Sequence, residues 1–282
     1  MNSDVIHTAG IGERAGSVLL SQWNEFCRLR TSVLGRCGTD DIHDLRVASR
    51  RLRATLGLFA PFISAKTVKI LSGEIRRVTR QLGHVRNIDE ASIYFNSLPA
   101  SLPVLAKRLR TLRQKEIAAV IKALKQFPCR DMGTLLRKAA AGLAGSATNN
   151  SVDQSLPAYL SDTSIQRYQV LHDLLAAALI AENHVLRHRL RISIKKWRYL
   201  LESVGQVCCQ DYASTLELLK EYQTVLGSLN DMVEFSALSD TRRLPQEERE
   251  AIKISLEQDS ERNLALFIEI ATSRPIQYIF LL

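Results

Sequence analysis

The same eleven-residue pattern occurs twice in this sequence, at His43–Arg53 and again at His188–Arg198. Both copies read His-x-Leu-Arg-x-x-x-basic-basic-x-Arg. Because an α-helix advances about 100° per residue, the His and three of the basic residues fall within one arc of about 80°. The residues on the opposite face are apolar in both copies: Leu45, Ala48, Leu52, Leu56 and Phe59, and then Leu190, Ile194, Trp197 and Leu201. The pattern therefore predicts two helices that each bury an apolar face and expose a row of basic side chains.

The excess positive charge of the chain is concentrated in these two segments. Residues 43–59 contain four Arg and one Asp, and residues 184–198 contain four Arg, two Lys and no acid, which gives +3 and +6. These charges together equal the formal net charge of +9, and the rest of the chain balances 28 basic against 28 acidic residues. An anionic partner is expected.

Helical periodicity extends over most of the chain and predicts an all-α fold. Leu, Ala, Arg and Lys dominate the long segments, and there are only seven Pro,. The expected helices span residues 13–35, 41–60, 65–84, 86–97, 101–127, 131–145, 162–182, 184–206, 210–228, 230–240, 245–272 and 275–281,. Six prolines are expected at helix boundaries: Pro61, Pro99, Pro103, Pro128, Pro157 and Pro245,.

A second pair of similar segments indicates an internal duplication. Leu82–Asn87 matches Leu226–Asp231 at an offset of 144 residues, close to the offset of 145 between the basic motifs. The intervening polar stretch predicts a linker at 146–156, between halves at 13–145 and 157–282,. We expect a single domain over 13–282, composed of two four-helix bundles related by a pseudo-two-fold axis, with a basic groove between them.

The basic faces have the chemistry of a phosphate-binding surface. Like charges at helical spacing repel, so a face that carries only one sign of charge is unusual for a merely solvated helix. Guanidinium groups match phosphate oxygens in pairs, Lys adds a mobile point charge, and His donates to an oxyanion. A linear ligand with many phosphates would suit such a row.

Structural interpretations of the same residues remain open. His43 and His188 lie near helix starts, where His also serves in capping or packing,. Trp197 and Tyr199 are expected in the core and at its rim rather than as platforms for stacked bases. Arg76, Arg80 and His84 share a helix face, where they either extend the phosphate track or pair with acidic neighbours,. The charges of helix 101–127 surround its circumference and indicate solvated surface.

These motifs resemble those of the CHAD family, the conserved histidine α-helical domain, in which each half has a His-x-x-Arg-x-x-x-basic-basic-x-Arg helix and a later Leu-Gly segment. Both motifs occur twice and in order, and the resemblance covers residues 13–282. It implies binding of inorganic polyphosphate in the groove between the bundles. The residues that would carry the binding are His43, Arg46, Arg50, Arg51, Arg53, His188, Arg191, Lys195, Lys196 and Arg198, with Arg76 and Arg80 as candidate extensions.

The sequence departs from the family pattern in one motif position. Asn87 stands where family members usually have Asp after Arg86, whereas Asp231 keeps the acid in the second half. If this Asp orients a neighbouring basic side chain, the first half does so less well. The family is often fused to a triphosphate-tunnel domain, for which no pattern is visible here, so a stand-alone copy is expected.

Three classes of function compete. The first is polyphosphate binding without catalysis and without a cofactor. The second is nucleic-acid binding, which the sequence pI near 9.5 permits but the scarcity of polar base readers and of aromatic residues, at 6%, disfavours,. The third is a metal-dependent phosphohydrolase or a His-ligated metalloprotein. Neither basic face contains the carboxylates that hold catalytic metal ions, and His184 with His188 lacks a third ligand nearby,.

The remaining features predict a soluble cytoplasmic protein, on polyphosphate granules if the polyphosphate interpretation is correct. The five Cys form no CxxC and are expected to be reduced thiols,. The first residues have no secretory-signal pattern. The apolar run Leu174–Ala181 has eight residues, far fewer than the roughly 20 that cross a bilayer, so no membrane partner is expected,.

Overall fold

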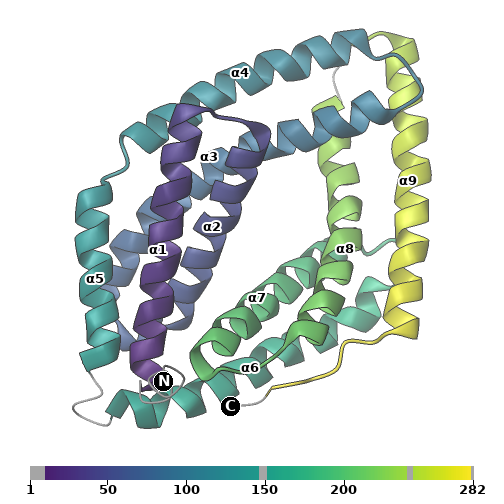
Figure 1. Ribbon diagram of the computed structural model, residues 1–282. Helices are drawn as coiled ribbons and strands as arrows, with labels where there is room; N and C mark the ends of the chain where they lie inside the picture. The colour runs from purple at the N-terminus through teal and green to yellow at the C-terminus, as the bar shows by residue number, and fades with distance from the viewer. Residues whose placement is uncertain (1–9, 146–150, 240–243, 281–282) are drawn as a thin grey trace, which may run out of the picture.

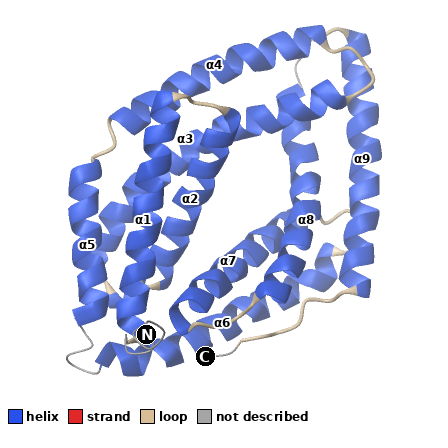
Figure 2. Ribbon diagram, in the orientation of Figure 1, coloured by secondary structure: helices blue, strands red, loops and turns tan. Residues whose placement is uncertain are grey.

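The computed structural model describes residues 10–145, 151–239 and 244–280, with the backbone alone for 151–154. These residues form helices, turns and connecting segments and contain no strand (Figures 1 and 2). The all-α prediction is therefore confirmed. The elements are α1 (Ile11–Gly35), α2 (Thr39–Leu58), the 3-10 helix η1 (Ala60–Phe62), α3 (Ala65–Ser97), α4 (Pro103–Lys125), α5 (Cys129–Gly145), α6 (Ser151–Ala178), α7 (His184–Cys208), α8 (Ala213–Ser239) and α9 (Gln246–Ser273).

The two motif helices bury the faces that the sequence pattern assigns to the core. All the apolar residues predicted opposite the basic rows are buried in α2, α7 and the residue that follows α2. Trp197 has no exposed surface, so its prediction as a core residue is confirmed. The charged face of each helix is consequently held at a fixed orientation by the packing of its apolar back.

Two expected helix pairs are each one continuous helix. The division expected between 84 and 86 lies inside α3, and the division expected between 228 and 230 lies inside α8. Both expected breaks lie two residues after the Gly of the Leu-Gly motif. Buried residues continue at helical spacing through the motif, from Leu82 to Val85 and Ile88 in α3, and this packing outweighs the roughly 1 kcal/mol cost of an internal Gly,.

The linker and the C-terminal segment also differ from expectation. Residues 151–156, expected in the linker, are helical, and α6 continues through Pro157 although Pro has no backbone donor,. Residues 146–150 of that linker lie outside the described part. The expected helix at 275–281 is wrong for the part described, because the chain after Ser273 is not helical. Instead Ile276 is buried and Phe280 stacks on Tyr212, with ring centroids 6.5 Å apart.

The two parts of the chain share their core. Helices α1 and α2 both pack against α7, and the hydroxyl groups of Thr55 and Ser203 are hydrogen-bonded at 3.1 Å across the buried contact between α2 and α7. Arg14 in α1 donates from Nε to the carbonyl oxygen of Val207, at 2.5 Å. A second, smaller core joins the C-terminal ends of α3 and α8 to α4 and α9. Neither part is therefore packed independently of the other.

The helices α6 to α9 pack in chain order, α6 on α7, α7 on α8 and α8 on α9 (Figure 1). Contacts of α3 with α8 complete the arrangement. The internal duplication and the division into two bundles stay predictions. None of the described helices combines the length and the hydropathy needed to cross a membrane.

Glu248 ties α9 to α4 through a buried helix cap. Its carboxylate oxygens accept hydrogen bonds from the backbone amides of Val104 and Leu105, both at 3.0 Å. These amides belong to the first turn of α4, where no intrahelical acceptor exists. The carboxylate thus joins α9 to the start of α4 beside the second core, where Leu105 and Ile252 are buried.

We predict that Glu248→Ala lowers the free energy of unfolding by about 2 kcal/mol, because it leaves amides at the start of α4 without an acceptor. Urea unfolding followed by circular dichroism measures the change. Glu247→Ala is the matched control, since Glu247 lies in the same first turn of α9 but is exposed. Equal destabilisation by the two substitutions would show that the cap contributes nothing beyond the charge at the start of α9.

Candidate anion-binding site

The basic faces of α2 and α7 meet in a cluster of Arg46, Arg50, Arg191 and Lys195, here named the basic cluster. Burial, together with the positive charges of Arg50 and Arg191, lowers the pKa of Arg46 to about 10. Burial also lowers the pKa of Arg191, with Arg50 contributing from the other helix. Four of the predicted site residues are therefore close enough, across the contact between α2 and α7, to act on one another's protonation.

Lys195 lies among the other cations of the basic cluster. Burial, followed by the charges of Arg191, Arg50 and Arg46, lowers its pKa from 10.5 to about 6, and Asp231 opposes this only in part. The amine is therefore largely uncharged at neutral pH in the free protein. A polyanion placed beside it would favour the protonated form and so increase the positive charge of the site.

The Leu-Gly motif provides the space in which the two buried Arg side chains lie. A Cβ atom built on Gly83 in α3 would be 3.7 Å from Nε of Arg46, and one built on Gly227 in α8 would be 3.9 Å from Nε of Arg191. The two motifs are thus in contact within each part of the chain. A side chain longer than Ala at either position would occupy the place of a guanidinium group.

Both of these Arg side chains have an unused donor. Nε of Arg46 and Nε of Arg191 are buried and have no hydrogen-bond partner among the described residues, and the same holds for Nδ1 of His43. A buried donor without an acceptor costs about 1–3 kcal/mol, more when it is charged. These three buried nitrogens all lie on the predicted basic rows.

Acidic side chains lie at one end of the basic cluster. Burial raises the pKa of Asp231, while Arg191 lowers it and Glu90 raises it. Glu90 forms an ion pair with Arg86 in α3. The basic faces predicted on α2 and α7 contain no acid, but the neighbouring helices α3 and α8 contribute Glu90 and Asp231. Sequence reasoning quoted Asp231 only as a motif residue and missed Glu90.

The two His residues of the motif differ in their surroundings. Burial and the charge of Arg86 lower the pKa of His43, which is therefore neutral at pH 7. His188 is exposed, and its Nδ1 is hydrogen-bonded to Oδ1 of Asn230 at 2.5 Å. Asn230 in α8 is equivalent by motif alignment to Arg86 in α3. The residue at this position is thus a cation beside His43, namely Arg86, and a neutral amide beside His188, namely Asn230.

Two predicted site residues share one carboxylate as their ion-pair partner. The carboxylate of Glu202 forms ion pairs with Nε of Arg51, at 3.4 Å, and with Nε of Arg198, at 3.3 Å. Tyr199 lies beside them, with its ring centroid 5.9 Å from Arg50 and 5.4 Å from Arg198. Arg51 and Arg198 are therefore less available to an anion than the basic cluster is, and Tyr199 lies at the rim as expected.

The remaining candidates lie at the opposite end from the acids. The pKa of Arg53 is lowered by burial, then by Arg76 and Arg50, so α2 and α3 continue the row of cations there. Arg80 is exposed in α3 and makes no hydrogen bond or ion pair within the described part of the chain. His84, which shares that face, lies 3.4 Å from Glu116, so it pairs with an acidic neighbour.

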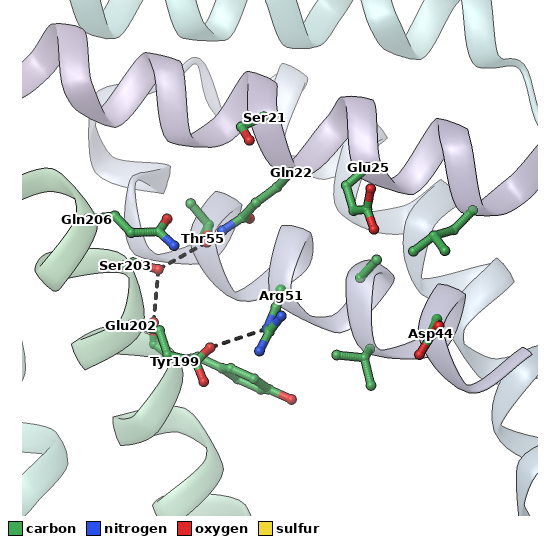
Figure 3. A pocket seen from close by; sticks show the side chains of 13 residues that line it. Ser21, Gln22, Glu25, Asp44, Arg51, Thr55, Tyr199, Glu202, Ser203 and Gln206 are labelled. Carbon is green, nitrogen blue, oxygen red and sulfur yellow. Dashed lines mark hydrogen bonds and ion pairs between the residues drawn. The ribbon is translucent and has the colours of Figure 1, made fainter. Parts of the chain in front are cut away.

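Two cavities flank the contact between α2 and α7. The first, the α1–α2 pocket, has a volume of about 540 Å³ and contains Glu25, Asp44, Arg51 and Glu202 (Figure 3). Figure 3 shows Arg51 directed toward Glu202 across this space. The second, the α6–α7 pocket, has about 650 Å³ and contains Lys196 with Arg53. Lys196 is therefore separated from the basic cluster and belongs to this cavity.

Metal-binding geometry is not found in the described residues, which contain no group of three His, Cys, Asp or Glu side chains able to hold an ion. His184 and His188 lie on an exposed stretch of α7 beside Glu234 and Glu261. The site is thus an arrangement of cations, backed by apolar packing and limited at one end by acids.

An all-helical fold with duplicated basic helices meeting in one buried cluster defines the class of this molecule. The family description "CHAD domain" matches residues 17–239, and the chain belongs to the CHAD family. The resemblance inferred from the motifs is thereby confirmed. No curated protein matches the sequence.

Solved structures with the same fold are distant in sequence. The crystal structure of the CHAD domain from the plant Ricinus communis is 20% identical, with 95% of this chain and 89% of that chain covered and a TM-score of 0.67. PptA from Streptomyces chartreusis is 17% identical, with 94% and 100% covered and a TM-score of 0.66. These likenesses establish the fold.

We predict that Lys195→Met raises the free energy of unfolding at pH 7. In wild type the unfolded chain binds the Lys195 proton up to its ordinary pKa of 10.5, whereas the folded chain loses it above about 6, so the cost to folding is full below about pH 6 and declines as pH rises toward 10.5,. The advantage of the variant should shrink as pH approaches 10.5. Urea unfolding at pH 7 and at pH 9.5 measures it.

Lys196→Met is the control, because Lys196 is the exposed neighbour in the same helix. A gain in stability that is the same for both substitutions, or that does not change with pH, would contradict the burial of an uncharged amine at Lys195.

Proposed function

We propose that this protein binds inorganic polyphosphate through the basic cluster, extended by Arg53 and Arg76, and that it does so without catalysis or a cofactor. The observation that carries the proposal is the pair of buried, unpartnered Nε donors on Arg46 and Arg191, held in the same way over Gly83 and Gly227. Membership of the CHAD family is the reason for choosing polyphosphate among polyanions.

A linear phosphate chain suits the shape of the row better than a nucleic acid does. The cations follow one another along α2, and the acidic side chains at Asp231 and Glu90 would repel a broad anionic surface. Recognition of single-stranded nucleic acid relies on exposed aromatic rings, but Trp197 is fully buried and Tyr199 is engaged by Arg50 and Arg198,. Polyphosphate has only to supply acceptor oxygens to the donors that the basic cluster already contains.

Binding without hydrolysis is expected from the composition of the site. Metal-assisted phosphoryl transfer uses carboxylates to hold the ions near the scissile phosphate. Asp231 lies near Arg191 and Lys195, where the protein's own cations compensate part of its charge. We infer that the protein is a cytoplasmic binding module that associates with polyphosphate, including its granules.

We predict that Arg46→Gln and Arg191→Gln each weaken binding of long-chain polyphosphate by about tenfold, the equivalent of one charged hydrogen bond. Each should also reduce the slope of log K against log salt by about 0.7, because one phosphate contact is lost. Isothermal titration over a salt series measures both quantities. Lys122→Gln, an exposed cation of α4, is the control.

The same titration with single-stranded and double-stranded DNA, at equal phosphate concentration, separates the competing interpretations. Polyphosphate should displace DNA, and the chain length of the polyphosphate should stay unchanged after incubation with Mg²⁺. Tighter binding of DNA would favour the nucleic-acid interpretation, and shortened chains would favour an enzyme. Unaltered binding by both Arg variants would remove the basic cluster from the site.

A second prediction concerns the glycine beneath Arg46. Gly83→Ala should leave binding intact and stabilise α3 by up to about 1 kcal/mol, because the added Cβ meets Arg46 at an ordinary contact distance,. Gly83→Leu should displace the guanidinium group and weaken polyphosphate binding about as much as Arg46→Gln does. Titration and urea unfolding of both variants test this.

Gly73→Leu is the matched control, since Gly73 lies in the same helix and a Cβ built there meets nothing within 4 Å. Normal binding by Gly83→Leu with a stability like that of Gly73→Leu would show that the position of the Arg46 guanidinium does not determine affinity.

A further inference from the structure

The two cavities beside the contact between α2 and α7 are lined by equivalent positions of the two sequence copies. Each lining residue of the α1–α2 pocket from Ser21 to Arg51 has a counterpart 145 residues later in the α6–α7 pocket. The pairs are Ser21 and Gln166, Gln22 and Arg167, Glu25 and Val170, Leu29 and Leu174, Asp44 and Arg189, Val47 and Ile192, Ala48 and Ser193, and Arg51 and Lys196. The cavities are therefore counterparts in the fold as well as in the sequence.

Their charges are opposite in character. The α1–α2 pocket contains three acids, Glu25, Asp44 and Glu202, with one cation, Arg51. At the equivalent positions the α6–α7 pocket has Val170, Arg189 and Gly57, so every acid is absent. Its lining holds four cations, Arg53, Arg167, Arg189 and Lys196, and no acid. At equivalent positions of the two sequence copies, one cavity thus has an excess of acids and the other is strongly positive.

One cation of the α6–α7 pocket, Arg167, is held by a backbone carbonyl. Arg167 donates from Nη1 to the carbonyl oxygen of Lys196 at 2.9 Å, and burial lowers its pKa. Arg189 is exposed at the pocket and forms no ion pair among the described residues. Ser193 and Tyr199 add hydroxyl groups to the lining. This lining therefore has many hydrogen-bond donors and no carboxylate that would compete with an anionic ligand for them.

The α6–α7 pocket is continuous with the row of cations proposed to bind polyphosphate. Arg53 belongs to both, because it lines the pocket and acts electrostatically with Arg50 and Arg76. Tyr199 likewise lines the pocket and packs its ring near Arg50. The other end of the row is limited by Asp231 and Glu90. An anionic chain that lies along the row meets repulsion at one end and, beyond Arg53, three further cations at the other.

We propose that the α6–α7 pocket is a second phosphate-binding site, which receives the part of a polyphosphate chain that extends beyond the basic cluster past Arg53. The inference rests on the proposed function and specifies the direction in which the bound polyphosphate chain extends. The chain continues into the cavity of the second copy, and the acidic α1–α2 pocket excludes it. Arg167 and Arg189, which the motif does not include, become ligand-binding residues.

Arg189→Ala and Arg189→Asp test the proposal, the latter placing in α7 the residue type that α2 carries at Asp44. Arg189→Ala should weaken long-chain polyphosphate binding about tenfold and lower the salt slope by about 0.7, and Arg189→Asp should weaken it further. Tripolyphosphate, which is too short to occupy both sites, should bind the variants as it binds wild type. Lys122→Asp is the charge-matched control, and circular dichroism checks folding.

Unchanged long-chain affinity for both Arg189 variants, while Arg46→Gln still weakens binding, would overturn this inference and leave the proposed function standing. An equal loss of tripolyphosphate and long-chain binding would overturn the continuity between the two sites. Absence of polyphosphate binding by wild type would remove the proposed function and this inference together.

Discussion

Burial of like charges at the contact between α2 and α7 is the constraint on which the rest of the structure depends. Removing a cation from water costs several kcal/mol even after the protein relaxes, and the charges here also repel one another. The lowered pKa values of Arg46, Arg191 and Lys195 all have burial as their largest cause. Such a cluster persists only because the opposite faces of the same helices are fully packed.

The shared core supplies that packing and explains why the two parts of the chain are not separable. Trp197 in α7 and Leu52 in α2 belong to one continuous core, and Thr55 and Ser203 join the two helices by a buried hydrogen bond. At the far end, Tyr94 in α3 donates a hydrogen bond to Asp259 in α9 at 2.8 Å and stacks on Phe235 in α8. These contacts hold the cations together against their mutual repulsion.

Much of this arrangement can be predicted from sequence because helical spacing assigns each residue to a face. The buried and charged faces of α2 and α7 follow directly from the positions of Leu45 and Arg46 or of Leu190 and Arg191. What escapes prediction depends on other helices. Gly83 indicates a helix boundary when read alone, but in the fold it is the place where Arg46 lies.

The same limit applies to the charges that tune the site. Glu202 neutralises Arg51 from a distance of about 150 residues in sequence, and Glu90 approaches Asp231 only because α3 and α8 pack together. A residue's helix face is a local property, whereas its partner is set by tertiary packing. The helix face of each candidate residue therefore follows from the sequence, whereas the pairing of some of these cations with carboxylates follows only from the tertiary structure.

The differences between the two sequence copies give the site a polarity that the repeated motif alone would not have. A duplicated framework with identical residues would present equivalent cavities, and a linear anion would have no preferred direction across it. Replacement of Asp44 and Glu25 by Arg189 and Val170 at the equivalent positions removes this equivalence. The electrostatic energy of a long anion then differs between its two orientations past the row, because one cavity contains three acids and the other contains none,. In the proposed binding mode, the shared framework places the cations, and the difference in charge between the two cavities sets the direction in which the ligand extends.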